Sequence, residues 1–380
     1  MKTATYLYRE ELLDKSHLSP NFSEEKSQLV LGFGNTATLG GSLFYEQIKN
    51  RFPNANIALC STAGEIFGNE VMEDCVSLTA IEFEKTEIQC AELTINNFSS
   101  SFDAGVALIS QLKKEDLRYV FVLSDGEKVN GSQLVNGINS LVLSNIPVTG
   151  GLAGNGVAFK STRVGLNAPA EEGNVLAIGF YGPSIKIAHG TMAGWENFGM
   201  EKTVTHSKDN LLFEIDHKNA LDLYKKYLGV YADDLPGSAL FFPLSVKQSE
   251  DVEPVVRTIL GINKENKSMI FAGDVPVGSK VRFMKSNIDQ LVDAASIAAQ
   301  QSIQRDEHQL PKLAILISCV GRKLILGKRV EEEIEAVADV FGNDVALTGF
   351  YSYGEISPVF HQGKCELHNQ TMTITTFDEL

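Results

Sequence analysis

Apolar residues along this chain recur with two different periods, and the change from one to the other marks the predicted elements. Short apolar runs at residues 28–34 and 56–61 predict buried strands. Between them, apolar residues follow helical spacing until Pro53 ends the pattern (Leu39, Leu43, Phe44, Ile48 and Phe52). The first predicted unit is therefore strand, helix, strand, and the glycine-containing loop STAGEIFG follows it.

The same order of elements recurs twice. A second unit has predicted strands at 119–126 and 146–149 with a helix between them, and it ends in the loop GGLAGNGVAF. A third has strands at 313–321 and 344–348, and it ends in GFYSYGEISPVF. Strands separated by helices favour parallel pairing with right-handed crossovers. The pattern predicts an α/β fold whose three units are either an internal repeat or the common strand–helix–strand motif.

Other segments alternate strictly and are split by short turns, which predicts added β-hairpins. The predicted hairpins pair 75–83 with 87–95, 174–182 with 185–192, and 255–262 with 268–273. A helical stripe from Ile288 to Ile303 follows, with Ser286 as the expected N-cap. Gly, Asp-Asp and Pro-Gly cluster after Leu228, so we expect two α/β domains, at 28–228 and 237–376, joined by a linker at 229–236.

Charge and composition restrict the class of function. The net charge is −15 and no Lys/Arg-rich run opposes it, so binding to nucleic acid or to anionic lipid is not expected. The five cysteines show no C-x-x-C spacing, which is typical of a reducing compartment. The charged N-terminus does not resemble a signal peptide, and no run of 18 apolar residues occurs. We expect a cytoplasmic protein.

The candidate chemistry lies where the predicted strands end, because ligands of open α/β sheets bind beyond the carboxyl ends of the strands. Arg322 offers a planar fork for a carboxylate, and Glu355 offers an acid for an ammonium, so the two would suit a small zwitterion. The alternative is a structural ion pair. The segment GFGNTATLGG lacks the G-x-G-x-x-G spacing of a dinucleotide-binding loop. Cys319 lacks the G-x-S-x-G frame of a nucleophile turn, although an enzyme using Cys319 remains a lesser alternative.

Two histidines are candidate metal ligands. His189 follows an alternating strand and precedes the single tryptophan, and His368 enters the last predicted strand. Each is expected either to be hydrogen-bonded in the core or to ligate a metal, since neutral imidazole suits iron.

Together these segments resemble the FIST family of sensory proteins, over about residues 28–376. The resemblance rests on STAGEIFG, GGLAGNGVAF and residues 194–229 in the N-terminal part, and on residues 257–284, SCVGRKLILG, GFYSYGEISP and LHNQT in the C-terminal part. The family's motif positions correspond here to Ser318, Cys319, Gly321, Arg322, Gly349, Tyr353, Gly354, Glu355, His368 and Asn369.

The resemblance implies a signal-input protein rather than an enzyme, one that binds a small ligand and acts on a separate partner such as a histidine kinase. One branch of the family senses nitric oxide through haem, which His189 or His368 would hold here. The other expectation is a polar metabolite such as an amino acid. The expected ligand-binding residues are Ser318, Cys319, Arg322, Tyr351, Tyr353, Glu355, His368 and Asn369. The oligomeric state is left open.

Overall fold

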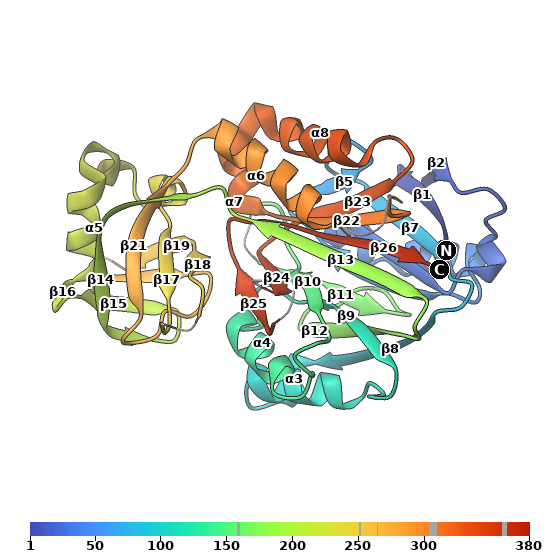
Figure 1. The fold of residues 1–380 in the computed structure, drawn as a ribbon, viewed down its shortest axis with the longest axis horizontal. Helices are drawn as coiled ribbons and strands as arrows, with labels where there is room; N and C mark the ends of the chain where they lie inside the picture. Colours follow the sequence, from blue (N-terminus) through green and yellow to red (C-terminus); the bar gives the residue numbers. More distant parts are fainter. Residues whose placement is uncertain (158–159, 251, 264, 304–309, 359–362) are drawn as a thin grey trace.

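The computed structural model describes the chain except for residues 158–159, 251, 264, 304–309 and 359–362. Figure 1 shows a large body and a smaller β domain beside it. The small domain extends from β14 (Glu196–Lys208) to β21 (Lys280–Lys285), and both ends of the chain lie in the body. The ends of the predicted loops at 158–159 and 359–360 lie outside the described residues.

Three six-stranded sheets form the body, and each is built on one of the predicted units. The first strand of each unit pairs in parallel with the second. On its other side, the first strand pairs antiparallel with a third strand, and this third strand pairs with an outer strand. The first strands are β3 (Leu29–Gly34), β9 (Leu117–Ser124) and β22 (Leu313–Cys319), and the second are β4 (Asn56–Ser61), β10 (Val148–Leu152) and β23 (Ala346–Ser352). The third strands are β7 (Val76–Glu82), β12 (Asn174–Tyr181) and β26 (Met372–Glu379), and the outer ones are β1 (Lys2–Arg9), β8 (Glu87–Thr94) and β13 (Ile185–Met192).

The strand after each glycine loop joins the sheet of another unit. β5 (Glu65–Phe67) of the first unit pairs with β23 of the third. β24 (Gly354–Pro358) of the third pairs with β10 of the second, and β11 (Val164–Leu166) of the second pairs with β4 of the first. The three units are therefore a structural repeat that is closed into a ring by exchanged strands. The short strands β2 (Leu12–Leu18), β6 (Glu70–Met72) and β25 (Cys365–His368) form sheet edges.

Two of the three predicted hairpins are wrong. Residues 75–83 and 87–95 contain β7 and β8, which lie in different sheets. Residues 174–182 and 185–192 contain β12 and β13, which also lie in different sheets. The turns within these segments carry the chain from one sheet to the outer strand of the next. The third hairpin is confirmed, since β19 (Ile259–Asn263) pairs with β20 (Ser268–Phe271) in the small domain.

A central core fills the space where the three sheets meet. Alternate residues of the first strands point into it: Leu29, Leu31 and Phe33; Tyr119, Phe121 and Leu123; Leu313, Ile315 and Ile317. The intervening residues, such as Val30, Val122 and Leu316, belong to outer clusters that contain helix residues. Burial on both faces explains why these strands are continuous apolar runs.

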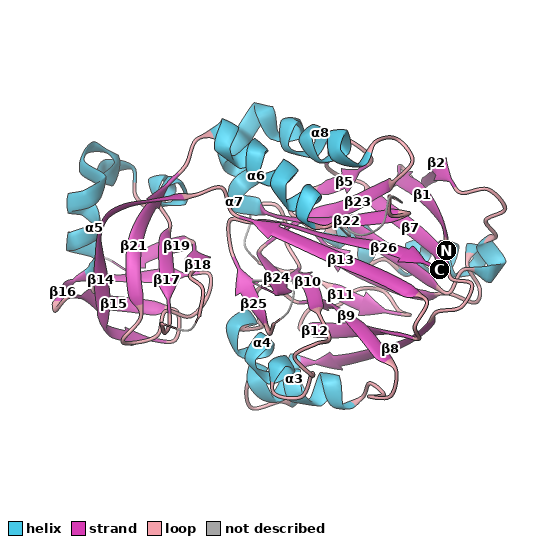
Figure 2. Cartoon of the chain, in the orientation of Figure 1, coloured by secondary structure: helices cyan, strands magenta, loops and turns pink. Residues whose placement is uncertain are grey.

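The helices cover the outer faces of the sheets (Figure 2). Helices α3 (Ser101–Ser110) and α4 (Gly131–Asn139) pack together over the second sheet, and α6 (Ile288–Gln301) and α8 (Val330–Phe341) do so over the third. The others are α1 (Thr36–Leu39), α2 (Ser42–Arg51) and α7 (Val320–Leu326), with short 3-10 helices at Glu24–Lys26, Ile95–Asn97 and Gly327–Arg329. The N-cap of α6 is Asn287, in a capping box with Gln290, and not Ser286 as predicted.

The small domain consists of one eight-stranded sheet and helix α5 (Ala220–Leu228). Its remaining strands are β15 (Leu211–Ile215), β16 (Lys218–Asn219), β17 (Leu244–Lys247) and β18 (Val255–Arg257), and 3-10 helices cover Gly229–Asp234 and Gly237–Phe241. Residues 229–236, predicted as a linker, lie inside this domain, where Ala232 and Leu235 pack against its core. No helix in the described part of the chain is long and apolar enough to cross a membrane.

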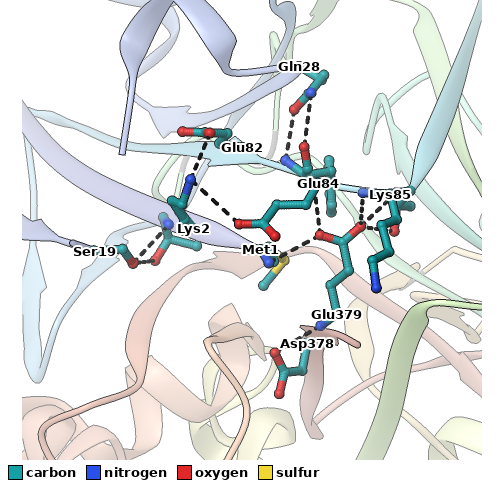
Figure 3. A network of polar contacts seen from close by, with 12 residues as sticks. Met1, Lys2, Ser19, Gln28, Glu82, Glu84, Lys85, Asp378 and Glu379 are labelled. Carbon is teal, nitrogen blue, oxygen red and sulfur yellow. Dashed lines mark hydrogen bonds and ion pairs between the residues drawn. The ribbon is translucent and has the colours of Figure 1, made fainter. Parts of the chain in front are cut away.

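Glu379, at the end of β26, ties the last strand to the turn between β7 and β8 (Figure 3). Its carboxylate accepts hydrogen bonds from the backbone N–H groups of Glu84, Lys85 and Thr86 at 2.6–2.7 Å. The amino group of Met1 lies 3.1 Å from the same carboxylate. These donors outweigh the effect of burial and lower the pKa of Glu379 to about 2.

Candidate functional site

Equivalent hydrogen bonds recur at the strand ends of the three units. In each unit, a backbone N–H at the end of the first strand donates to a carbonyl at the start of the third. These bonds join Asn35 to Cys75 at 3.3 Å, Asp125 to Asn174 at 2.9 Å, and Cys319 to Thr371 at 3.1 Å. Bonds between units bring these ends into one region: Ala63 N donates to the Tyr351 carbonyl at 2.8 Å, Gly154 N to the Ser61 carbonyl at 2.8 Å, and Tyr353 N to the Leu152 carbonyl at 3.2 Å. The sequence predicted a ligand in this region, beyond the carboxyl ends of the strands.

A cavity of about 300 Å³ opens between these loops, and we call it the junction cavity. All three units contribute to its wall: the first strand end and glycine loop of unit one, the glycine loop of unit two, and α7 of unit three. The lining residues are Asn35, Thr62–Glu65, Glu73, Asp74, Asn155, Gly156, Val157, Val320, Lys323 and Leu324. Its volume is at the lower end for small-molecule sites, so it suits a small ligand.

Glu65 is the buried acid of this cavity, with 2% of its surface exposed. Its carboxyl accepts from the Thr62 hydroxyl at 2.5 Å and from the Cys75 thiol at 3.6 Å. Burial raises the pKa of Glu65 to about 7, although these donors and Lys323 act in the opposite direction. Near neutral pH the group therefore exists both as carboxylate and as acid.

Lys323 provides the positive charge of the cavity. Its ammonium donates to the Ala63 carbonyl at 2.8 Å and to the Glu73 carboxylate at 2.5 Å, and lies 5.6 Å from the ring centroid of Tyr351. Because an ammonium has three donors, one N–H remains for a ligand. Gly64 leaves room for the Lys323 ammonium, because a Cβ on Gly64 would lie 2.4 Å from the Lys323 nitrogen. The φ of Gly64, +141°, also favours glycine.

Two asparagines complete the polar wall. The side-chain oxygen of Asn35 caps α1 by accepting from Thr38 N at 2.9 Å, which leaves its NH₂ group as a donor. Asn155 is held by its backbone N–H, which donates to the Tyr353 hydroxyl at 3.0 Å. Tyr353, one of the predicted ligand residues, therefore lies behind this wall and supports it.

Arg322, the predicted carboxylate fork, pairs with Glu333 and not with Glu355. Both Arg322 and Glu333 are fully buried, and Nε and Nη2 donate to the same Glu333 oxygen at 3.0 and 2.8 Å. The remaining Arg322 bonds go to the carbonyls of Ala193 and Leu291. Ser318 and Tyr351, also predicted to bind ligand, donate to the other Glu333 oxygen at 3.1 and 2.7 Å. This geometry is that of a structural network.

Glu355 occupies in the third unit the position of Glu65 in the first. It accepts from Ser352 at 2.6 Å, as Glu65 does from Thr62, and from the Thr371 hydroxyl at 2.8 Å. Burial raises the pKa of Glu355 to about 7. Asn369 is also fully buried, and neither polar atom of its side chain has a hydrogen-bond partner among the described residues. Here the small domain covers the strand ends.

Cys319 is 3% exposed, and burial raises the pKa of its thiol far above the usual value. A thiol that stays neutral and buried is a poor nucleophile. This environment argues against the alternative of an enzyme based on Cys319.

The two candidate haem ligands lie in strands. His189 is 6% exposed and pairs with Thr375 in the third sheet. The His368 Nε2 lies 3.0 Å from the Ser357 carbonyl, and burial lowers the pKa of this imidazole to about 4. Two further cavities are present, one of about 420 Å³ between the small domain and the body and one of about 700 Å³ beside α8. Neither histidine lines these two cavities or the junction cavity. The two histidines therefore do not fit a haem site in these three cavities.

The junction cavity lies in the region that the sequence predicted for a ligand, but its lining differs from the predicted residues. None of the eight predicted ligand residues lines the junction cavity as the described residues form it, and Glu65 and Lys323 were not predicted. The signals for both were present: Glu65 stands in the loop STAGEIFG, and Lys323 is the neighbour of Arg322.

The fold and cavity define an α/β protein of three interlocked units with a small polar cavity at their strand ends. The chain belongs to the FIST family: the FIST N domain matches residues 28–218 and the FIST C domain matches residues 220–358. FIST domains are sensory domains of signal transduction. The boundary between the two matched segments lies within the small domain.

No curated protein matches the chain in sequence. Among solved structures, a cyanuric acid hydrolase from A. caulinodans is 9% identical, with 94% of this chain and 91% of that chain covered and a TM-score of 0.34. A second cyanuric acid hydrolase is 11% identical over 99% of both chains, with a TM-score of 0.32. Scores at this level do not establish a shared activity.

Proposed function

We propose that this protein is a cytoplasmic sensor that binds a small zwitterion, such as an amino acid, in the junction cavity. It would report the bound state to a separate signalling protein such as a histidine kinase. The observation that carries the proposal is the presence of Glu65 and Lys323 on the wall of one small cavity. Membership of a sensory family supports a binding role over catalysis.

The two charged groups suit the two ends of a zwitterion. The third N–H of the Lys323 ammonium would bind the ligand carboxylate, with the Asn35 amide as a further donor. The Glu65 carboxylate would accept from the ligand ammonium. The positive charge of that ammonium favours the ionised form of Glu65, so binding below about pH 7 would release a proton.

The position of the cavity gives a route to signalling. Its wall combines Asn35, Glu65 and Asn155 from the FIST N segment with Val320 and Lys323 from the FIST C segment. A ligand that contacts both segments stabilises the arrangement in which they are close. Such a ligand shifts the population between conformations by the difference in its affinity for them.

The haem and nitric oxide form of the sensor has less support. Neither His189 nor His368 lines any of the cavities described above, and burial keeps the His368 imidazole neutral and hydrogen-bonded to a carbonyl. We therefore derive no step through haem, and we favour the metabolite.

Calorimetric titration with a panel of amino acids tests the proposal. We expect at least one to bind, and a ligand at 100 times its Kd raises the stability by about 2.7 kcal/mol. Lys323→Met and Glu65→Gln should each weaken binding about ten- to a hundredfold, since each removes a charge-assisted bond. Lys328→Met is the matched control, because Lys328 is exposed beyond the end of α7. Binding that is unaffected by both cavity variants would refute this site.

The pH dependence supplies a second readout. Affinity for the amino acid should increase with pH up to about 7 and then level off as Glu65 becomes fully ionised. The Glu65→Gln variant should bind weakly at every pH and lose this slope. A wild-type slope that persists in Glu65→Gln would show that another group titrates.

A further inference from the structure

Two short connections join the small domain to the body (Figure 1): residues 193–195 before β14 and residues 286–287 after β21. The Ser286 hydroxyl donates to the Gly194 carbonyl at 2.6 Å, so the two connections lie side by side. A Cβ on Gly194, whose φ is +75°, would lie 2.7 Å from the Gln290 carbonyl oxygen of α6. The small domain is therefore joined to the body at one narrow base, beside the start of α6.

Helix α7 contacts this base and also carries the lysine of the junction cavity. Arg322 donates to the Ala193 carbonyl of the first connection at 2.9 Å and to the Leu291 carbonyl of α6 at 2.7 Å. The next residue, Lys323, lines the junction cavity and donates to the Ala63 carbonyl at 2.8 Å. Because hydrogen-bonded networks and short rigid elements transmit displacements, the position of the lysine and the position of the connection are linked.

Gln370, in the loop between β25 and β26, forms a second bridge from α7 to the small domain. Its side-chain amide donates to the Leu240 carbonyl of the small domain at 3.3 Å, and its backbone carbonyl accepts from the Trp195 indole at 3.2 Å. The same side chain packs on the backbone of Gly321 in α7, because a Cβ there would lie 2.6 Å from the Gln370 amide nitrogen. Gln370 thus contacts α7, the first connection and the small domain at once.

The backbone of Gln370 has a conformation that residues other than glycine rarely adopt. Its φ is +60°, and the equivalent residue of the second unit, before the carbonyl that receives the repeated bond, is Gly173 with a φ of +81°. The Gln370 side chain is fully buried, and its oxygen has no hydrogen-bond partner among the described residues. Strained residues cluster in switch regions, so this bridge is suited to a contact that forms and breaks.

We propose that α7 and Gln370 couple the junction cavity to the small domain, so that an amino acid bound at Lys323 stabilises the orientation of the small domain seen in Figure 1. We call this the docked orientation, and the coupling rests on the function proposed above. A ligand carboxylate on Lys323 holds α7 in place, and α7 in turn holds Ala193 and Gln370. The ligand therefore binds the docked state more tightly than a state in which the bond from Gln370 to Leu240 is broken.

Other bonds hold the docked orientation independently of α7. Arg257 of the small domain donates to the Leu367 carbonyl at 2.7 Å, and the Asp274 carboxylate accepts from the Asn130 amide at 3.1 Å. These bonds lie outside the bridge, so loss of the bridge should uncouple the small domain from the ligand without detaching it.

The single tryptophan of the chain provides a reporter of this bridge. Trp195 donates to the Gln370 carbonyl and does not line the junction cavity, so its fluorescence follows the bridge and not the ligand itself. Titration of the full chain with an amino acid that binds by calorimetry should shift the Trp195 emission, with the same Kd in both measurements. Calorimetric binding without an emission shift would overturn the coupling and leave the proposed sensing intact. Absence of binding by every amino acid would overturn the proposed function and the coupling with it.

Two cavity variants separate a bond to α7 from occupancy of the cavity alone. At amino-acid concentrations that saturate each variant, Glu65→Gln should keep the emission shift, because the ligand still bonds to Lys323. Lys323→Met should lose the shift at saturation, because the ligand carboxylate no longer bonds to α7. A wild-type shift in Lys323→Met, or its loss in Glu65→Gln, would overturn the role of α7.

Gln370→Gly removes the bridge and suits the backbone, since glycine adopts a φ of +60° without strain. The variant should fold, bind the amino acid within about fivefold of the wild-type affinity, and lose most of the emission shift at saturation. Asn21→Gly is the matched control, because Asn21 is exposed and also has a positive φ, of 58°, and it should keep the shift. A full shift in Gln370→Gly would overturn the role of Gln370.

Discussion

Removal of Arg322 tests whether this residue stabilises the fold or binds a ligand. In Arg322→Met, the fully buried Glu333 carboxylate loses both guanidinium bonds and keeps only Ser318 and Tyr351 as donors. The carbonyls of Ala193 and Leu291 lose their donors as well. Removing one partner of a buried ion pair typically costs 3–5 kcal/mol.

We therefore expect Arg322→Met to lower the free energy of unfolding by about 3–5 kcal/mol, because it leaves a buried carboxylate without its cation. Urea denaturation followed by circular dichroism at pH 7 measures this loss. The double variant Arg322→Met/Glu333→Leu should regain about half of the loss, because no buried charge remains. The reasoning is refuted if Arg322→Met costs less than about 1 kcal/mol at pH 7. If that variant also failed to bind amino acids, Arg322 would be the carboxylate fork that the sequence suggested.

Three further predictions follow from the same geometry. Gly64→Ala should displace the Lys323 ammonium from the Ala63 carbonyl and weaken amino-acid binding about tenfold by calorimetry. An unchanged affinity would contradict the role of Lys323 as a ligand-binding residue in this position. The pKa of Glu355 is about 7 in the folded state, above the value of about 4.3 expected in the unfolded chain. Between these two pH values the folded state keeps a proton that the unfolded state has lost. The contribution of Glu355 to stability should therefore fall by roughly 3 kcal/mol as the pH rises from about 4.5 to 7. Glu355→Gln should make the overall fall in urea titrations smaller by that amount, while the contribution of Glu65 remains. Glu379→Gln should cost about 2 kcal/mol at pH 7, because a carboxylate that accepts several N–H bonds is lost. Since the folded pKa of Glu379 is about 2, the difference should shrink as the pH falls below about 4, and a constant difference would contradict this role.

The order of elements in the body was predictable, and their pairing was only partly so. Runs such as 29–34 and 313–317 are apolar at every position because both faces of β3 and β22 are buried, and this pattern is visible in the sequence. The predicted hairpin at 75–95 failed because alternation identifies strands without identifying their partners. The partners of β7 and β8 belong to different sheets, and only the closed ring of three units determines that arrangement.

The candidate site shows the same limit on a smaller scale. Arg322 and Lys323 are neighbours on α7, and successive helical residues point about 100° apart, so only one of them can face a given cavity. Sequence reasoning chose Arg322, whose planar fork is the better carboxylate receptor in general. The fold buries Arg322 against α8 and turns Lys323 to the cavity, and this choice depends on the packing of α7, which no local pattern encodes.

The exchange of strands between units has a consequence for any fragment of this chain. A fragment that ends at residue 218 contains the FIST N segment but lacks β24, which completes the sheet of the second unit beside β10. The backbone edge of β10 would then be open, and unpaired edges of this kind recruit strands from other molecules. It also lacks β23, the partner of β5, so the Glu65 loop would lose its anchor. The two FIST segments are therefore a division of the sequence and not of the folding unit, and neither half is expected to be soluble and binding-competent without the other.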